Sequence, residues 1–208
     1  MKIHHYYFSI QKRVFDIFLA LLLLIVLSPL LIIIGLMVLL GAGSPIVFKQ
    51  KRLGKNGQTF TAYKFRTMQK NASMLKSKYI HLNEAPTPMF KITRDPRFVG
   101  IGWILSRTGL DELPQLWNIL CGQMSFVGPR PLPINEARAL PKDWRFWREQ
   151  VRPGVFSEWS SSPQKHLSLE NWEKLEKTTL KKGGLKEDLQ QIFSSIKLIL
   201  MFFLRRKS

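Results

Sequence analysis

The feature that most constrains this chain is an uncharged, apolar stretch at residues 17–40 that a proline interrupts near its middle. The stretch exceeds the roughly 20 residues with which a helix crosses a bilayer. A proline inside a helix removes one backbone donor and clashes with the carbonyl four residues earlier, so Pro29, which follows Ser28, should break the helix next to Ile25. Each half, if helical, is roughly 18 Å long and reaches about halfway through a ~30 Å hydrocarbon core. The segment therefore predicts either a kinked span or a re-entrant hairpin.

Basic residues flank the apolar stretch on both sides and bear on its topology. Lys12 and Arg13 precede it, and Lys49, Lys51 and Arg52 follow it. Because basic flanks favour the cytoplasmic side of a membrane, both ends are drawn to the same side. A hairpin satisfies this preference and a straight span does not. Proline is nevertheless common in transmembrane helices, so both topologies stay open at this point.

The charge of the chain indicates an anionic partner. Its 32 Lys and Arg residues outnumber its 14 Asp and Glu residues, which gives a formal net charge of +18. Nucleic acid, acidic membrane lipids or a phosphorylated substrate would each suit such a surface. The sequence contains no nucleic-acid-binding motif, so we expect no nucleic-acid partner. Cys121 is the only cysteine, which excludes an intramolecular disulfide, and we expect it to be buried in the core rather than to act as a nucleophile.

The pattern after the apolar segment predicts a mainly helical α+β fold. β-Branched and aromatic residues on both sides of a turn at residues 54–57 predict a small β-hairpin at 45–68. Thr108 lies three residues before Asp111, which is the spacing of a helix capping box. An apolar stripe then continues the expected helix to Gly122. Its members are Leu113, Leu116, Trp117 and Leu120.

Further elements are predicted from apolar periodicity and from helix-stopping residues. They are a helix at 100–107 with Ile101, Ile104 and Leu105 on one face, a rigid proline-rich loop at 125–133, a basic aromatic helix at 144–151 and an amphipathic interfacial helix at 189–204.

Two adjacent carboxylates, Asp111 and Glu112, are the first candidates for chemistry. At the start of a helix such residues usually complement the helix dipole, so their surroundings decide the matter. Several arginines lie in or beside turns around them, and a guanidinium group suits phosphate because it donates in a planar fork. Each of these cations could instead be a solvated surface charge, and Lys64 could simply lie on the polar face of its strand. The arginines are Arg66, Arg94, Arg97, Arg107 and Arg130.

Six segments, in order along the chain, resemble the bacterial sugar transferases, the monotopic polyprenyl-phosphate phosphoglycosyl transferases. The segments are the apolar stretch broken at Ser28 and Pro29, YKFRTM at 63–68, TRDPR at 93–97, LDELPQLWN at 110–118, MSFVGPRP at 124–131 and RPG at 152–154. The resemblance is strong from about residue 12 to residue 154, and six motifs in the right order are difficult to obtain by chance.

The resemblance implies an enzyme at the cytoplasmic face of the bacterial inner membrane with a re-entrant membrane helix. Its reaction would transfer a sugar-1-phosphate from a nucleotide-sugar, which we expect to be a UDP-sugar, to undecaprenyl or another polyprenyl phosphate. An aspartyl-phosphosugar would be the intermediate, and surface glycan synthesis, of exopolysaccharide or lipopolysaccharide, would start with this step. Asp111 would be the nucleophile, and Asp111 and Glu112 would bind the Mg²⁺ cofactor. The candidate phosphate- and substrate-binding residues are Lys64, Arg66, Arg97, Arg107, Arg130 and Arg152.

On this basis we expect three parts along the chain. Residues 1–44 form the membrane hairpin, 45–188 a cytosolic catalytic domain at the membrane surface, and 189–208 an apolar and basic interfacial helix. Residues 155–162 depart from the family's usual sequence, as do Ser106, where a basic residue is usual, and Gly109, where a serine is usual. The departure at 155–162 bears on the accepted sugar or nucleotide rather than on the type of reaction.

Two non-catalytic functions stay open as alternatives. One is a basic membrane-anchored protein that binds acidic partners, and the other is a degenerate family member that acts as a scaffold. Magnesium-dependent release of a nucleoside monophosphate would separate an enzyme from both. The sequence leaves open the sugar, the nucleotide, the lipid length, the final glycan and the oligomeric state, with a homodimer as one option.

Overall fold

The apolar segment forms two consecutive helices that meet at a sharp bend. Helix α1 (Ile10–Val26) and helix α2 (Ser28–Ala42) are bent by 64° with respect to each other. The hydroxyl of Ser28 donates to the carbonyl of Ile25 at 2.8 Å, the acceptor that an amide at position 29 would use in an unbroken helix. The break predicted at Ser28 and Pro29 is therefore confirmed, and the serine hydroxyl supplies the donor that the proline lacks.

The β-hairpin predicted at residues 45–68 is also confirmed. Strands β1 (Val47–Leu53) and β2 (Thr59–Phe65) pair antiparallel in a two-stranded sheet. The short helix η2 (Lys55–Gly57) forms the turn between them, where two glycines and an asparagine had indicated one.

One buried side chain attaches β2 to the rest of the fold. The side chain of Asn118 accepts from the amide of Tyr63 at 3.1 Å and donates to the carbonyl of Thr61 at 2.7 Å, as the main chain of a neighbouring strand would. Successive side chains of a strand point to opposite faces, so Lys64 lies on the same face of β2 as the buried Ala62. This face turns toward the interior and not toward solvent.

The helix predicted to run on from Asp111 is interrupted. A short helix, η4 (Leu110–Glu112), carries the two carboxylates, and α4 (Gln115–Leu120) follows it. The predicted capping box is wrong, because Thr108 ends α3 (Gly102–Thr108) and its hydroxyl donates within that helix at 2.9 Å. Gly109, whose φ of 74° is left-handed, then redirects the chain into η4. The carboxylates therefore lie in a tight link between two short helices.

Three side chains are more exposed than the sequence indicated. Cys121, predicted to be in the core, is exposed, and the side chains of Trp117 and Ile104 are 57% and 47% exposed. Leu105 and Leu116, on the same helices, are buried as predicted. Helices α3 and α4 are only 7 and 6 residues long, so each buries a narrow stripe and leaves the neighbouring apolar positions uncovered.

The second half of the chain brings a correction as well. The first residues of the loop predicted at 125–133 form strand β3 (Ser125–Val127), which pairs parallel with β4 (Gly154–Phe156). The sequence could not indicate this pairing, since the two strands are short and far apart along the chain. The helix predicted at 144–151 is confirmed as α6 (Lys142–Arg148).

The remaining helices are η1 (His5–Phe8), η3 (Ile80–Leu82), α5 (Ile134–Arg138), α7 (Glu158–Ser161), α8 (Leu169–Lys181) and α9 (Leu185–Leu204).

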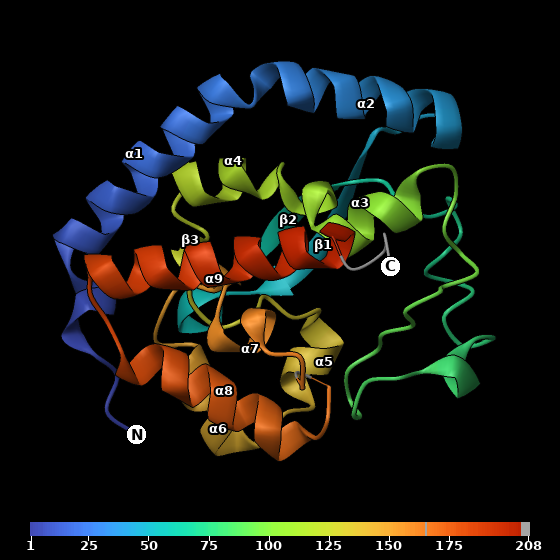
Figure 1. Cartoon of the computed structure of the whole chain (residues 1–208). Helices are drawn as coiled ribbons and strands as arrows, with labels where there is room; N and C mark the ends of the chain where they lie inside the picture. Colours follow the sequence, from blue (N-terminus) through green and yellow to red (C-terminus); the bar gives the residue numbers. More distant parts are fainter. Residues whose placement is uncertain (165, 205–208) are drawn as a thin grey trace.

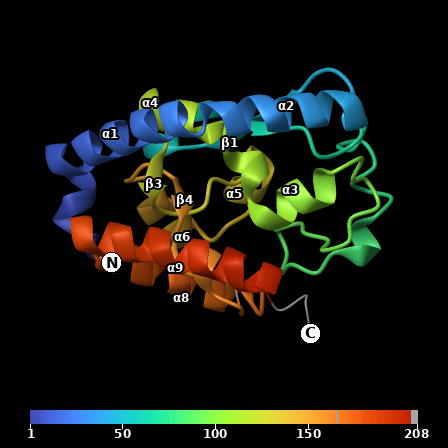
Figure 2. The same cartoon turned by 45° about the horizontal axis from the view of Figure 1, so that its top comes forward.

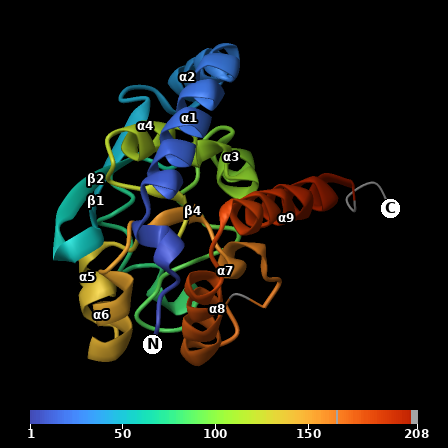
Figure 3. The same cartoon turned by 90° about the vertical axis from the view of Figure 1, so that its left-hand side faces the viewer.

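The computed structural model describes residues 1–164 and 166–204, so the last four residues of the interfacial helix predicted at 189–208 lie outside the described residues. Helices α1 and α2 form an arch over one side, with α3 and α4 directly beneath it and α8 on the far side (Figures 1 and 2). The β1–β2 hairpin and α9 lie on opposite flanks (Figure 3). Of the helices in the described part, none is by itself long and apolar enough to cross a membrane, and α1 and α2 meet that criterion only as a bent pair.

The arch is buried on one face only. Ala20 of α1 belongs to a buried cluster with side chains of β2, α4 and β3, and Val38 of α2 to one with side chains of β2 and α3. On the outer face, the apolar side chains of Phe18 and Leu40 are 65% and 87% exposed. The two arms of the arch therefore rest on α4 and α3, the helices on either side of η4 and its carboxylates.

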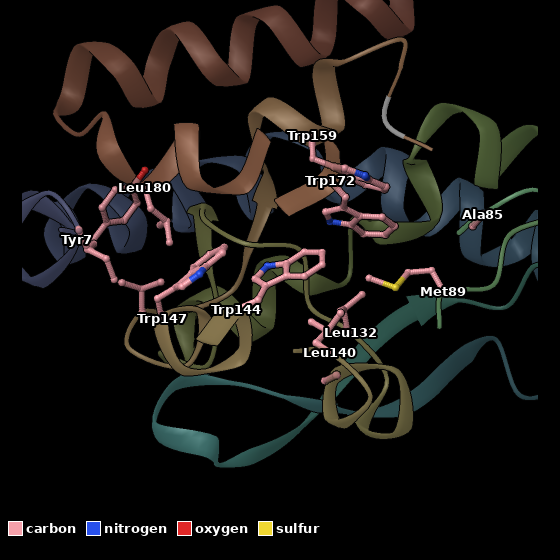
Figure 4. Close-up of a cluster of buried hydrophobic side chains, with 13 residues drawn as sticks. Tyr7, Ala85, Met89, Leu132, Leu140, Trp144, Trp147, Trp159, Trp172 and Leu180 are labelled. Atoms are coloured by element: carbon pink, nitrogen blue, oxygen red, sulfur yellow. The ribbon is translucent and has the colours of Figure 1, made fainter. Parts of the chain in front are cut away.

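Four tryptophans dominate the core on the far side from the arch (Figure 4). Trp159 and Trp172 are stacked with ring centroids 4.3 Å apart, and Trp144 and Trp147 with centroids 6.3 Å apart. They come from α6, α7 and α8. The segment at 155–162, which departs from the usual sequence of the family, thus contributes Trp159 to this core.

A buried ionic network connects the base of the arch to two other elements. Lys12 of α1 bonds to Asp16 at 2.8 Å and to Asp188 of α9 at 2.7 Å, and all three side chains are almost completely buried. Asp16 also accepts from the hydroxyl of Ser125 and the amide of Phe126 in β3, both at 3.2 Å. Lys12 therefore links α1 to α9, and Asp16 links α1 to β3.

Candidate active site

The two candidate carboxylates differ in their surroundings although they are adjacent in sequence. Asp111 is 6% exposed, and Glu112 is partly buried. The Nζ atom of Lys64 lies 2.5 Å from Oε1 of Glu112 and 4.0 Å from Oδ2 of Asp111. The guanidinium group of Arg130 lies 3.2 Å from the same Oε1 atom. The structure thus brings together four predicted residues from three separate motifs.

These contacts drive the pKa values of the two carboxylates apart. Burial raises the pKa of Asp111 above its usual range; the charge of Lys64 opposes this rise and that of Glu112 reinforces it. Burial also acts to raise the pKa of Glu112, but the positive charges of Lys64 and Arg130 outweigh it and hold that pKa well below its usual range. A pair of carboxylates in such different electrostatic surroundings is suited to two different roles.

Two further cations, Lys91 and Arg52, belong to this electrostatic cluster, and the sequence reasoning missed both. Lys91 is exposed at the surface, but the surrounding protein still partly desolvates its amine and lowers its pKa. The charges of Arg130 and Lys64 lower this pKa further, whereas the nearby carboxylates oppose the shift. Burial lowers the pKa of Arg52 to about 10, with the charge of Arg130 adding to the effect and that of Glu112 opposing it. Lys91 stands just before the TRDPR motif, and Arg52 had been assigned only to the basic flank.

The other candidate phosphate-binding residues have different surroundings. Arg66 donates to the carbonyls of Ala42, Gly43 and Ser44, which places its guanidinium at the end of α2. Arg97 forms a fork with Asp95, with bonds of 2.8 and 2.6 Å. For both residues the structure shows donors bonded to protein groups rather than directed at the carboxylates.

The remaining candidate arginines are Arg152, Arg107 and Arg94. Arg152 donates to the carbonyl of Gly122 at 2.8 Å, beyond the opposite end of α4 from Asp111. Arg107 is exposed at the end of α3, and Arg94 is exposed in the TRDPR segment. The structure thus shows contacts to the carboxylates for Lys64 and Arg130, and other protein partners for Arg66, Arg97 and Arg152.

The carboxylates offer a restricted set of oxygen ligands for a divalent cation. Within residues 1–164 and 166–204 no group of three or more His, Cys, Asp and Glu side chains could enclose a metal ion. Oε1 of Glu112 already accepts from Lys64 and Arg130. Mg²⁺ commonly uses one or two carboxylates together with water and substrate phosphate, so Asp111 and the second oxygen of Glu112 fit such an ion.

The structure thus places a pair of carboxylates in contact with two cations, beneath the half-exposed apolar arch. The model of the bacterial sugar transferase family matches residues 7–202, so this chain belongs to that family. The match continues past Gly154, where the motif resemblance weakened, and therefore includes α7, α8 and most of α9.

Similar proteins from several bacteria support this assignment. The chain is 35% identical over 192 residues to the exopolysaccharide production protein ExoY of Sinorhizobium fredii, a match that covers 90% of this chain and 84% of the relative. It is 32% identical over 197 residues to the undecaprenyl-phosphate galactose phosphotransferase of Salmonella typhimurium, covering 91% and 40%. It is 38% identical over 146 residues to the UDP-glucose:undecaprenyl-phosphate glucose-1-phosphate transferase of Escherichia coli, covering 69% and 29%. The chain thus spans less than half of the latter two relatives.

Proposed function

We propose that the protein transfers a sugar-1-phosphate from a nucleotide-sugar, in the simplest case a UDP-sugar, to undecaprenyl phosphate and so starts the synthesis of a surface polysaccharide. The observation that carries this proposal is the convergence of Asp111, Glu112, Lys64 and Arg130 from three motifs. The names of the relatives from Salmonella typhimurium and Escherichia coli support undecaprenyl phosphate as the acceptor. The name of the Sinorhizobium fredii relative supports a role in exopolysaccharide production.

In the proposed first half-reaction, a carboxylate oxygen of Asp111 attacks the β-phosphorus of the donor. The bond from that phosphorus to the bridging oxygen breaks, a nucleoside monophosphate leaves with the electron pair, and the sugar phosphate becomes an acyl phosphate on Asp111. In the second half-reaction an oxygen of the lipid phosphate attacks the same phosphorus and Asp111 leaves as a carboxylate. The products are a lipid-linked diphosphosugar and the original enzyme.

Lys64, Arg130 and Glu112 have distinct roles in this scheme. Arg130 can present its guanidinium fork to phosphate oxygens while one edge is held against Glu112, and Lys64 places a second positive charge between the two carboxylates. Glu112 stays ionised because both cations favour its charged form. A bound Mg²⁺ would neutralise charge on the diphosphate of the donor.

We further propose that the arch lies in the cytoplasmic leaflet of the inner membrane, with both ends facing the cytoplasm. The arms contain 17 and 15 residues and are bent by 64°, so a symmetric arch raises its apex by roughly 13 Å at ~1.5 Å per residue, less than half of a ~30 Å core. The exposed apolar outer face supports this placement. A substrate whose phosphate is anchored at the bilayer surface could then reach Asp111.

Cysteine labelling tests this topology. Because Cys121 is exposed, the experiment starts from a Cys121→Ser variant, into which His5→Cys or Lys49→Cys is introduced at exposed positions on either side of the arch. A membrane-impermeant maleimide should label neither cysteine in intact cells and both after permeabilisation. Labelling of either one in intact cells would show that the segment crosses the membrane.

The proposed function is tested by omitting the lipid acceptor. Purified wild-type protein given a UDP-sugar and Mg²⁺ should release at most one equivalent of UMP, and mass spectrometry should find the sugar phosphate on the peptide that contains Asp111. A scaffold protein would give neither signal, with or without lipid. Full turnover with lipid but no adduct without it would replace the two-step scheme by direct transfer in a ternary complex.

A further inference from the structure

The backbone of the Pro129-Arg130-Pro131 loop offers a single amide donor, because proline has none. That donor, the N–H of Arg130, bonds to Oε1 of Glu176 at 3.0 Å. The carbonyl of Arg130 accepts from Nη2 of Arg148 at 2.5 Å. Arg148 and Glu176 are themselves an ion pair, so one pair of charged side chains bonds to both backbone groups of Arg130.

The surroundings of Glu176 fix the orientation of its carboxylate. It is fully buried in α8, and its two oxygens accept from four donors: Arg130, Arg148, the indole of Trp172 at 3.2 Å and that of Trp144 at 3.1 Å. A buried carboxylate is strongly disfavoured without such partners, so every donor offsets part of the cost of burial and holds the side chain in one orientation. Its orientation in turn determines where the amide of Arg130 must lie.

The same cluster of residues also orients the side chain of Arg130. Its guanidinium lies 5.0 Å from the ring centroid of Trp159, and Trp159 is stacked on Trp172, which donates to Glu176. Figure 4 shows the two stacked rings within the core. The guanidinium is thus placed between a rigid aromatic face and Glu112, which it contacts at 3.2 Å.

We propose that the Arg148–Glu176 ion pair is the positioning device of the active site: it holds the backbone of Arg130 so that the guanidinium reaches Glu112 and the substrate phosphate together. This inference rests on the proposed function, in which Arg130 binds phosphate. It assigns a role in catalysis to α6 and α8, two helices without a residue in any of the six motifs. Both side chains are buried, so in this scheme they act through Arg130 and not directly on the substrate.

A double-mutant cycle tests the proposal with the full-length protein. Arg148→Lys keeps the charge beside Glu176, but a single ammonium group cannot reproduce the planar fork that meets Glu176 and the carbonyl of Arg130. We expect kcat to fall by about 10²-fold, the loss typical of a ~1 Å misplacement, with KM for the nucleotide-sugar changed far less. In an Arg130→Lys background, where the positioned fork is already absent, Arg148→Lys should lower kcat by little more. Equal fold-losses in both backgrounds would overturn the proposal.

Glu176→Gln serves as the second variant and should show the same dependence on Arg130. Glu173→Gln is the matched control, since Glu173 lies on the same helix in a partly exposed pair with Lys177, and it should keep wild-type kcat. Thermal unfolding measured alongside identifies variants that fail to fold; if neither Arg148→Lys nor Glu176→Gln folds, the pair is a core element and the proposal is wrong. A fully active Arg130→Lys variant, or a wild type without turnover, would instead reject the proposed function.

Discussion

Replacement of Asp111 by asparagine is expected to lower turnover by about 10³-fold or more, the scale seen when a catalytic nucleophile is removed. An amide is neutral and a poor nucleophile, so the variant should also form no covalent sugar phosphate. The rate of UMP release and the mass of the Asp111 peptide measure the two effects. Because Asp111 and Asn have almost the same shape, the loss should not arise from repacking of η4.

The stability of this variant provides an internal check. Burial raises the pKa of Asp111 above that of the unfolded chain, so at neutral pH the ionised carboxylate costs stability in the folded state. Asp111→Asn removes that cost, and its thermal midpoint should equal or exceed that of the wild type. Glu112→Gln should retain the adduct in reduced yield; an adduct in Asp111→Asn that is missing in Glu112→Gln would reverse the roles of the two residues.

Replacement of Lys12 by methionine is expected to lower the free energy of unfolding by about 3–5 kcal/mol, the cost of breaking a buried ion pair on one side only. Methionine fills a similar volume but leaves Asp16 and Asp188 buried without their shared cation. Denaturant or thermal unfolding in detergent or nanodiscs measures the change. At about 2–4 °C per kcal/mol for a chain of this size, the midpoint should fall on the order of 10 °C.

Lys177→Met is the control for this effect, because Lys177 is 38% exposed and pairs with Glu173 on the surface of α8. Its loss should change stability by less than about 0.5 kcal/mol. If the Lys12 deficit arises from the uncompensated carboxylates, adding Asp16→Asn and Asp188→Asn to Lys12→Met should restore part of the stability. A triple variant less stable than Lys12→Met would show that the deficit has another origin.

The parts of the fold that the sequence predicted are those with local signals. The break at Pro29, the hairpin turn and the basic aromatic helix each follow from residues within a few positions of one another. Thr108 shows the limit of such signals, since the same residue suits a helix start or a helix end and the packing of α3 selects the second. The pairing of β3 with β4 depends on segments far apart in the chain, which no local pattern reveals.

The sequence identified residues of the candidate site only where they belong to a recognisable motif. Lys64 and Arg66 stand two positions apart in one motif, yet the first contacts Glu112 and the second the carbonyls that end α2. Sequence spacing cannot distinguish these outcomes, because a carboxylate and a set of backbone carbonyls are both suitable partners for a cationic side chain. Glu176 lacked even a motif, and only its complete burial next to Arg130 reveals it.

The bend angle of the arch affects η4, the short helix that carries Asp111. The first arm of the arch packs on α4 and its second on α3, and residues 109–114, which include η4 and Asp111, connect those two helices. Any opening or closing of the 64° angle would therefore drive α3 and α4 apart or together and strain the turn between them. The bond from Ser28 to Ile25 stiffens the angle at its vertex. Under the membrane placement proposed above, bilayer thickness and lateral pressure would act through this angle on the position of Asp111.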